Sequence, residues 1–324
     1  MMHDPLCKAL MKSRSALFLD GWIKFNEEKW GYKAERVLFQ PAGKELPKLE
    51  GVFYLDRRGH VVMPPRNPYL PLQFTPTPTE QPYRLYTQWL EVSELLASDL
   101  EKRGFRGTIS FPPGFTDGRG FQWKSFSTNF RYTFATPLPV EPTNQDPSVR
   151  QKINKAIRLG YRVQQTNDWE AVHFCLQKTE DAKDFSHMTP AKDLARLSEL
   201  LGGDHCLGYI CRDTAGNPVS GQIKIFLSDG ISIDWSAGTD REHIKNGVNQ
   251  LTYEESFKDM TASRGHLFDL CGANIKPVAN AKATWGFPLV PYLTITHETA
   301  PRKLFRFFVP KTIRPALRQI LRGV

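Results

Sequence analysis

The sequence of 324 residues has no long apolar run and few cysteines. No stretch of about 18 apolar residues occurs, so we expect no membrane-spanning helix. The five cysteines are odd in number, scattered and never spaced as CxxC, which argues against disulfides and against a zinc site. The first residues lack the pattern of a secretory signal peptide. We therefore expect a cytoplasmic protein without a metal, whose thiols are reduced and mostly buried.

The apolar content is sufficient for a full core, and the positive charge is unevenly distributed. The chain is 40% hydrophobic and 12% aromatic, which suits one large or two ordinary domains. The net charge is +9, but seven basic residues and no acid lie in residues 301–324. The rest of the chain therefore carries a surplus of only +2. The basicity is a property of the C-terminal segment.

This basic segment, residues 301–324, predicts an amphipathic helix. Its apolar side chains share one stripe: Ile313, Ala316, Leu317, Ile320 and Leu321. Three arginines share the opposite stripe: Arg314, Arg318 and Arg322. Two interpretations stay open. The segment binds an anionic membrane surface at the inner face of the membrane, or it is a terminal helix docked on the body of the protein.

The first half predicts strands, a proline-rich connection and one long helix. Turn residues bound apolar segments at 37–40 and 51–55. Seven prolines in residues 64–82 forbid a helix and most central strand pairing, which predicts a long ordered loop. A lid over a substrate groove is the alternative. Helical spacing of apolar residues then predicts a helix over 83–103, followed by a strand from residue 107.

Two aromatic segments, residues 121–126 and 130–135, carry interleaved basic residues and predict strands. Such interleaving can stack and hold single-stranded nucleic acid. Half-buried strands with one solvated face explain the pattern as well.

The second half predicts a regular series of elements. Helices are expected at 150–160, 167–180 and 191–201, antiparallel strands at 206–212, 219–227 and 230–237, then a helix at 243–262 and a strand at 266–271. The helix end Arg264-Gly265 followed at once by a strand repeats the arrangement at Arg103-Gly104, about 160 residues earlier. This repetition predicts two similar domains in tandem.

Four motifs carry a resemblance to a known family. They are Arg150-xx-Ile153-xx-Ala156-xxx-Gly160, Ile233-Asp-Trp-Ser-Ala-Gly238, Phe268-Asp-Leu-Cys-Gly272 and Asn280-Ala-Lys282-Ala-Thr-Trp-Gly286. The sequence resembles the Fem aminoacyl transferases of peptidoglycan bridge synthesis and their FemAB-like relatives. The resemblance implies an α/β (α+β) fold of two tandem GNAT-like acyl-CoA N-acyltransferase domains with mixed, mainly antiparallel sheets. We expect the domains at residues 1–140 and 141–300, before the tail at 301–324.

The resemblance implies an acyl- or aminoacyl-transferase that forms an amide on an amine of a cell-envelope or polysaccharide precursor. The donor would be an acyl-CoA or an aminoacyl-tRNA. One alternative is an acyl-CoA-dependent N-acyltransferase that acts on an amino sugar. Another is a GNAT-like binding protein without catalytic activity that takes part in envelope assembly.

The resemblance also places the donor site. In GNAT domains the donor's pyrophosphate lies where a strand passes into a helix, on the free N–H groups of the helix. The matching residues here are Gly238, Arg241, Lys245, Gly247 and Asn249. Ile244 stands where the family loop has Gln or Arg, so only half of that loop is present. This departure favours an aminoacyl-tRNA donor over coenzyme A.

The acceptor site follows from the other motifs. Lys282 matches a lysine that lies at the acceptor's anionic groups in the Fem proteins, and a cation on a short helix suits a phosphate. Three more residues complete the expected substrate site: Asn274, Trp235 and Tyr292.

Amide formation also needs a group that takes the amine's proton. The candidates are Asp269, Asp234 and His266, and each also has a plain structural interpretation. A buried aspartate must be paired or protonated, and a raised pKa would make it a usable base. Cys271 is the alternative nucleophile, but no motif places a histidine or acid to activate it.

Overall fold

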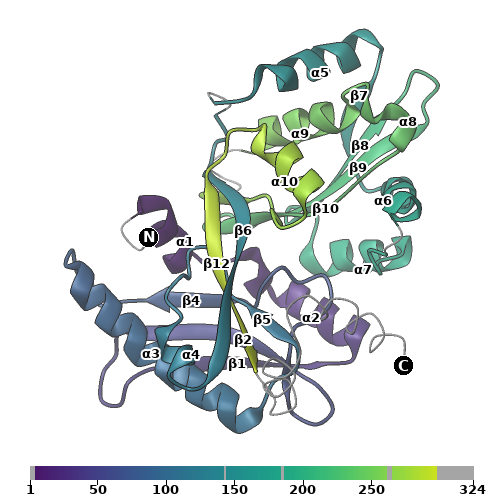
Figure 1. Cartoon of the computed structure of the whole chain (residues 1–324). Helices are drawn as coiled ribbons and strands as arrows, with labels where there is room; N and C mark the ends of the chain where they lie inside the picture. The colour runs from purple at the N-terminus through teal and green to yellow at the C-terminus, as the bar shows by residue number, and fades with distance from the viewer. Residues whose placement is uncertain (1–3, 142–143, 184–185, 261–264, 298–324) are drawn as a thin grey trace, which may run out of the picture.

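The computed structural model describes residues 4–141, 144–183, 186–260 and 265–297 (Figure 1). The predicted tail helix at 301–324 lies outside these residues. In chain order the elements up to residue 141 are α1 (Pro5–Lys12), η1 (Ala16–Phe18), α2 (Asp20–Trp30), β1 (Lys33–Phe39), β2 (Lys48–Leu55), β3 (Val61–Val62), β4 (Leu72–Thr75), α3 (Pro82–Arg103), β5 (Thr108–Ser110), α4 (Arg119–Gln122) and β6 (Phe126–Pro137).

The elements after residue 143 complete the described chain. They are α5 (Pro147–Arg158), β7 (Arg162–Thr166), α6 (Trp169–Lys183), α7 (Ala191–Leu201), β8 (Cys206–Arg212), β9 (Pro218–Ile225), β10 (Ile231–Thr239), α8 (Arg241–Ile244), α9 (Val248–Asp259), β11 (Leu267–Asp269), α10 (Lys276–Ala283) and β12 (Leu289–His297). Among the helices that the structure describes, none is long and apolar enough to cross a membrane.

A small antiparallel sheet is built on β2. Strands β1, β3 and β4 all pair with β2. Trp89 of the long helix α3 is fully buried against this sheet, with its ring steeply inclined to those of Phe74 and Phe115. The predicted proline-rich loop therefore contains a short strand, β4, between Pro71 and Pro76. A proline at each end of a strand leaves the ladder between them intact.

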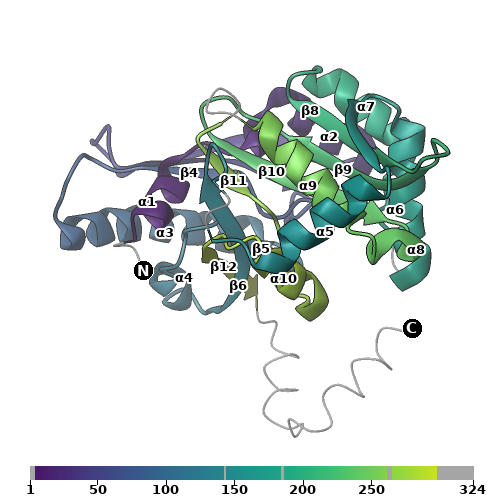
Figure 2. The ribbon, with the colours of Figure 1, turned by 90° about the horizontal axis from the view of Figure 1, so that it is seen from above.

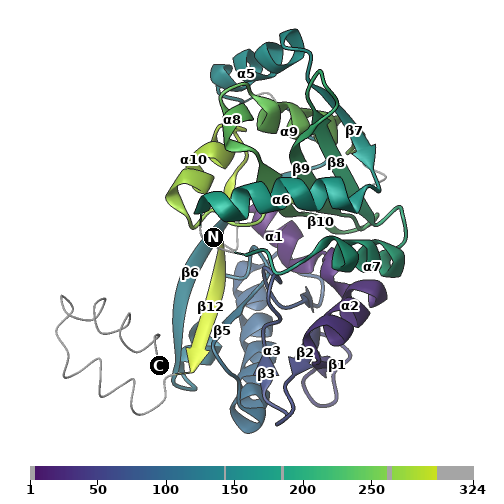
Figure 3. The ribbon, with the colours of Figure 1, turned by 90° about the vertical axis from the view of Figure 1, so that its right-hand side faces the viewer.

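The large sheet has eight strands in the order β5-β12-β6-β11-β10-β9-β8-β7. Only the β10–β11 pair is parallel among the described strands, so the predicted fold class of mixed, mainly antiparallel sheets is confirmed. β6 and β12 run side by side from the upper to the lower part of the molecule (Figures 1 and 3). The sheet thus joins strands from both sides of residue 140, where we predict the domain boundary. That boundary stays a prediction.

Alternation along the strands explains why helices cover both faces of this sheet. In β8, Cys206 and Ile210 face the core beneath α6 and α7, whereas Leu207 and Tyr209 face the core beneath α5 and α9. Successive side chains of a strand point to opposite faces, so a strand that is apolar throughout needs cover on both sides. Figure 2 shows α5 and α9 together on one side. The N-terminal helix α2 packs against α7 on the other side.

Two predicted elements are wrong. Residues 119–122 form the short helix α4 and turn residues follow, so the aromatic strand begins at Phe126 rather than at residue 121. Gly120 allows this helix to touch α3, because a Cβ there would lie 2.5 Å from Ser93 Oγ. The single helix predicted over 243–262 is two helices, α8 and α9, separated at Gly247. The glycine has a φ of +83°, which breaks the helical path.

Candidate active site

The two parallel strands of the large sheet separate at one point. β10 and β11 pair over three residues, ending at Ile233 and Asp269. β10 continues with an irregularity after Asp234, whereas β11 stops. The chain then turns away through Cys271 and Gly272, whose φ angles are +49° and +76°. The ladder between the two strands ends here, and polar side chains take its place.

Asp234 is the centre of this polar group. Lys224 of β9 donates to Asp234 Oδ1 at 2.6 Å, and the hydroxyl of Tyr253 on α9 donates to Oδ2 at 2.6 Å. The side chains of Lys224 and Asp234 are 0% and 2% exposed. Burial lowers the pKa of Lys224, and the charge and hydrogen bond of Asp234 act in the opposite direction. A charge this deep is tolerated because it is paired.

Lys282 links the separated strands from the side of α10. Its ammonium donates to the carbonyl oxygens of Leu270 and Cys271 and lies 3.6 Å from Asp234 Oδ2. The side chain is 13% exposed, so it is not a solvated helix lysine. Its role at an acceptor's anionic groups stays a prediction.

Asp269 is the second buried carboxyl. Its Oδ1 accepts from the hydroxyl of Thr133 on β6 and from the N–H of Cys271, whereas Oδ2 has no hydrogen-bond partner among the described residues. Burial raises the pKa of Asp269, and the donors Thr133 and Cys271 only partly offset this effect. A carboxyl of raised pKa with one oxygen outside the hydrogen-bond network can accept and return a proton.

Two more side chains lie around this carboxyl. Tyr69 is fully buried, and its hydroxyl lies near the Asp269 carboxyl without forming a hydrogen bond of good geometry. Burial raises the pKa of Tyr69, and the interaction with Asp269 raises it further. Burial and Asp269 also raise the pKa of Cys271 well above its usual value. The thiol is therefore protonated at neutral pH, which weakens the interpretation of Cys271 as a nucleophile.

Arg66 brings a cation to the site from the proline-rich segment. Its backbone has a φ of +67°, and its guanidinium donates to Ser236 Oγ at 2.6 Å. The indole N–H of Trp235 donates to the Arg66 carbonyl at 3.0 Å. Burial lowers the pKa of Arg66, its Nε has no acceptor, and no described carboxylate lies within ion-pair distance. Arg66 is thus a largely buried cation that makes no direct ion pair with a described carboxylate, and the charge of Glu180 acts on it from farther away.

His187 shows the effect of this charge on its surroundings. Burial, followed by the positive charge of Arg66, lowers the pKa of His187 to about 4. Its Nδ1 lies 2.8 Å from Glu180 Oε1. At neutral pH the imidazole is therefore uncharged, and the nearby positive charge belongs to Arg66.

The predicted donor residues run from the end of β10 through α8 to the start of α9. A Cβ at Gly238 would lie 2.3 Å from the Cys175 carbonyl, and one at Gly247 would lie 2.2 Å from the Lys152 carbonyl. Both glycines thus permit close packing, of α6 on β10 and of α5 on α9. The remaining side chains differ: Arg241 and Lys245 are exposed, and Asn249 accepts from Gln222 at 3.3 Å. Tyr253 follows Asn249 by one turn, about 6 Å along the helix.

Of the residues predicted to bind the substrate, Asn274 and Tyr292 lie together, whereas Trp235 lies in the core. The proton-transfer candidate His266 lies apart from both. The side chain of Asn274 bonds to the backbone N–H and carbonyl of Tyr132, each at 2.9 Å, and its amide donates to the hydroxyl of Tyr292 at 3.3 Å. Trp235 belongs to the core, with its ring perpendicular to that of Trp22 at 5.5 Å. His266 is exposed at the start of β11, three residues from Asp269. The structure therefore brings Asp234, Asp269 and Lys282 together and leaves His266 apart.

Five residues of this site were not among those predicted from the sequence: Lys224, Tyr253, Thr133, Tyr69 and Arg66. Lys224 has a visible signal, because it is a lysine flanked by isoleucines in the strand predicted at 219–227. Arg66 has none, since arginine in a proline-rich loop is ordinary. Among the described residues, no group of three or more His, Cys, Asp or Glu side chains is placed to hold a metal ion.

Comparisons with known proteins identify the fold. By sequence the chain matches no protein-family model and no curated protein. Among solved structures, FemX is 13% identical with a TM-score of 0.59, over 90% of this chain and 94% of FemX. The C-terminal domain of a protein assigned as a lysylphosphatidylglycerol synthetase from Agrobacterium fabrum is 9% identical with a TM-score of 0.56, over 93% of each chain.

A third structure extends the likeness to a protein without an assigned function. It is a conserved protein from Bacteroides thetaiotaomicron, 11% identical with a TM-score of 0.53, over 91% of this chain and 97% of its own. All three likenesses run over nearly whole chains, so they concern the complete arrangement of both sheets. The chain therefore shares the fold of these three proteins, in agreement with the fold that the sequence resemblance implies.

Proposed function

We propose that the protein is an acyl- or aminoacyl-transferase that forms an amide on an amine of a cell-envelope or polysaccharide precursor. The observation that carries the proposal is the carboxyl of Asp269, which is buried where β10 and β11 separate and has one oxygen without a partner among the described residues. The fold it shares with FemX and with the lysylphosphatidylglycerol synthetase domain supports this class of reaction.

Asp269 supplies the proton transfer that amide formation needs. The amine nitrogen attacks the donor's carbonyl carbon, the new C–N bond forms, and the C–O bond of an aminoacyl ester or the C–S bond of a thioester breaks. The amine loses one proton, and the leaving oxygen or sulfur gains one. Asp269 Oδ2 accepts the first proton and returns it to the leaving group.

Positive charge at the site stabilises negative charge on the substrates. Lys224 and Lys282 lie beside the carboxylate of Asp234, and the guanidinium of Arg66 bonds to Ser236, two residues further along β10. In a site this dry, fixed charges act strongly on the oxyanion that develops at the donor carbonyl. Arg66 is the cation that an anionic group of the acceptor would pair with, since no described carboxylate pairs with it.

Two further features belong to the proposal. Asp269 is 1% exposed, so a substrate reaches it only when the covering residues move, and the segment that carries Arg66 and Tyr69 would serve as the lid. The close contact of α5 with Gly247 narrows the start of α9, where coenzyme A would place its pyrophosphate. This contact favours an aminoacyl-tRNA as the donor.

The test measures transfer of a radiolabelled group to nucleotide-linked amino sugars and to their peptide-bearing forms. Aminoacyl-tRNA and acetyl-coenzyme A are compared as donors. Asp269→Asn keeps an acceptor oxygen for Thr133 and Cys271, so the variant should fold, and we expect transfer to fall by about 100-fold or more. Asp229→Asn, the same change at an exposed turn residue, is the matched control.

Each outcome separates the interpretations of the site. Equal transfer by the two variants would remove Asp269 from the mechanism. Transfer from acetyl-coenzyme A alone would favour the N-acyltransferase that acts on an amino sugar. If the native protein transfers nothing but a precursor raises its melting temperature, the binding protein without catalytic activity is the better description.

A further inference from the structure

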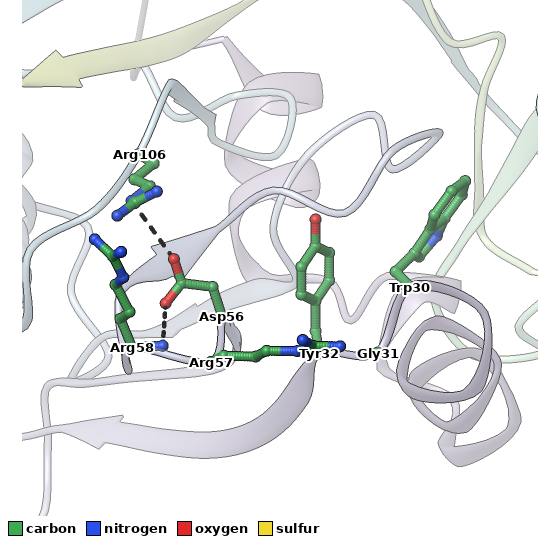
Figure 4. A pocket seen from close by; sticks show the side chains of 7 residues that line it. All are labelled: Trp30, Gly31, Tyr32, Asp56, Arg57, Arg58 and Arg106. Atoms are coloured by element: carbon green, nitrogen blue, oxygen red, sulfur yellow. Dashed lines mark hydrogen bonds and ion pairs between the residues drawn. The ribbon is translucent and has the colours of Figure 1, made fainter.

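A second site lies in the small-sheet part of the molecule, built from elements that do not contribute to the candidate active site. It is a cavity of about 330 Å³ between the end of α2, the β2–β3 turn and the segment before β5 (Figure 4). Its walls carry three arginines, two aromatic rings and one acid: Arg57, Arg58, Arg106, Trp30, Tyr32 and Asp56. We call it the arginine cavity.

The single acid of the arginine cavity is already bonded within the protein. Asp56 Oδ1 accepts from the N–H groups of Arg58 and His60 at 2.8 and 3.0 Å, and Oδ2 lies 3.5 Å from Arg106 Nε. Burial acts to raise the pKa of Asp56, but the N–H groups of Arg58 and His60 outweigh it and hold the pKa below its usual value. Asp56 is thus ionised and balances one guanidinium. Arg57 and Arg58 have no carboxylate partner among the described residues.

The remaining charge decides which ligands fit. Three guanidinium groups and one carboxylate leave a surplus of two positive charges. The carbonyl end of α2 also points to this region and contributes about half a negative charge. The surplus of two positive charges is several times larger than the partial negative charge at the end of α2. The arginine cavity therefore favours an anion.

The three segments that line the arginine cavity have a defined backbone path. The N–H of Gly59 donates to the Asp56 carbonyl at 2.9 Å and closes the β2–β3 turn. The N–H of Arg106 donates to the Val61 carbonyl at 3.0 Å and fixes the segment before β5 on the same turn. Gly31, with a φ of +67°, ends α2 and leads directly into β1. The backbone positions of the arginines are therefore fixed before any ligand is present, which reduces the entropy lost on binding.

The aromatic side of the arginine cavity adds a second requirement. In Figure 4, Tyr32 stands between the arginine side chains and Trp30. The ring of Trp30 is held on one side by the ammonium of Lys29 at 4.7 Å. These rings give an apolar wall beside the cationic one, which suits an anion that carries an organic group.

We propose that the arginine cavity binds the phosphate group of an organic phosphate ester. A guanidinium binds two phosphate oxygens at once, and arginines on neighbouring segments can engage one phosphate from two directions. The volume suits a small ligand or a lipid headgroup. The site uses α2, β1–β3 and the chain before β5, so it does not depend on the reaction proposed above.

The test uses the full chain with soluble and membrane-bound phosphates. Calorimetric titration with inorganic phosphate and with glycerol 3-phosphate measures the soluble arm, and co-sedimentation with phosphatidylglycerol vesicles measures the lipid arm. The variant R57A/R58A removes two exposed turn side chains, and R158A/R162A removes two exposed arginines elsewhere as a control of equal charge. We expect R57A/R58A to weaken glycerol 3-phosphate binding at least tenfold and the control to leave it unchanged.

The two arms identify the source of the phosphate. If R57A/R58A loses glycerol 3-phosphate but keeps vesicle binding, the ligand is a soluble ester; if vesicle binding falls in this variant alone, it is a lipid headgroup. The proposal is overturned if the native protein binds neither glycerol 3-phosphate nor the phosphatidylglycerol vesicles. It is also overturned if R57A/R58A and the control weaken binding equally.

Discussion

Lys224 and Asp234 form an ion pair of 2.6 Å whose side chains are 0% and 2% exposed on neighbouring strands. Lys258 and Glu255 are also 2.6 Å apart, but on the surface of α9, where they are 59% and 35% exposed. The buried pair also has further partners, because Asp234 accepts from Tyr253 and lies 3.6 Å from Lys282. The comparison therefore shows what burial and these supporting contacts add to a salt bridge of fixed length.

We expect Lys224→Met to lower the free energy of unfolding by about 3–5 kcal/mol, because it leaves the Asp234 carboxylate buried with one partner fewer. Lys258→Met should change it by at most about 1 kcal/mol, since water screens the exposed pair. Urea denaturation of both variants measures the difference. The double variant K224M/D234N carries no buried charge at this pair and should lose less than K224M alone. Equal losses for K224M and K258M would contradict this account.

Asp269 should make stability depend on pH. Its pKa is raised in the folded protein, so the folded state binds the proton more tightly than the unfolded chain does. The stability that this proton contributes is fully present below the ordinary carboxyl pKa of 3.8 and is lost as the pH rises through the raised value. The Asp269→Asn variant has no ionisable group at this position and therefore lacks this contribution to the pH dependence of stability.

The measurement is the difference in unfolding free energy between the native protein and Asp269→Asn across this pH range. The native protein should lose stability relative to the variant as the pH rises from 3.8. A difference that stays constant, or that moves in the native protein's favour, would show that Asp269 is not held in its neutral form.

The sequence was informative where local patterns decide the structure. Alternating apolar residues and hairpin turns predicted β8, β9 and β10, and helical spacing predicted α3 and α7, because these signals depend only on near neighbours. The strand predicted at residue 121 failed because Phe121 is buried in the aromatic core beside Phe111 and Phe126, and a helical turn serves that contact as well as a strand does. The apolar pattern around residue 121 is therefore compatible with a strand and with a helical turn.

The site was predicted in part for the same reason. Asp234, Asp269 and Lys282 lie in motifs and could be found in the sequence. Arg66 bonds to Ser236, which lies 170 residues later in the sequence. No local periodicity predicts a contact between residues so far apart. The role of Gly247 was also hidden, because the close approach of the Lys152 carbonyl is a tertiary contact.

The charge of Arg66 should be detectable through His187. Arg66→Met keeps most of the side-chain volume but removes the charge that helps to lower the pKa of His187 to about 4. We expect this pKa to rise toward, without reaching, the ordinary value of 6.5, because burial is the larger cause and remains. NMR titration of the imidazole measures the shift, and Arg119→Met, at the exposed start of α4, is the control.

The same change should alter acid stability. A lowered histidine pKa gives stability that is present above 6.5 and is lost as the pH falls toward about 4. The loss should therefore be smaller in Arg66→Met than in the native protein. An unchanged His187 pKa would place the guanidinium too far away, or too well screened, to act on it.

Three glycine-to-alanine variants test whether α5 is fixed against the start of α9. Gly203 has open space around it and no positive φ, and Gly216 has open space and a φ of +86°. Gly247 combines a φ of +83° with a close neighbour, because a Cβ added there would lie 2.2 Å from the Lys152 carbonyl. Gly203→Ala should change the unfolding free energy little. Gly216→Ala should cost about 1–2 kcal/mol for the left-handed backbone.

Gly247→Ala should cost more than Gly216→Ala, because the overlap with Lys152 adds to the same backbone strain. Urea denaturation of the three variants gives the order. If Gly247→Ala and Gly216→Ala lose equal stability, α5 moves aside freely, and the start of α9 can open to admit a bulky pyrophosphate. A clear excess for Gly247→Ala means that α5 stays in place, and the case for an aminoacyl-tRNA donor over coenzyme A becomes stronger.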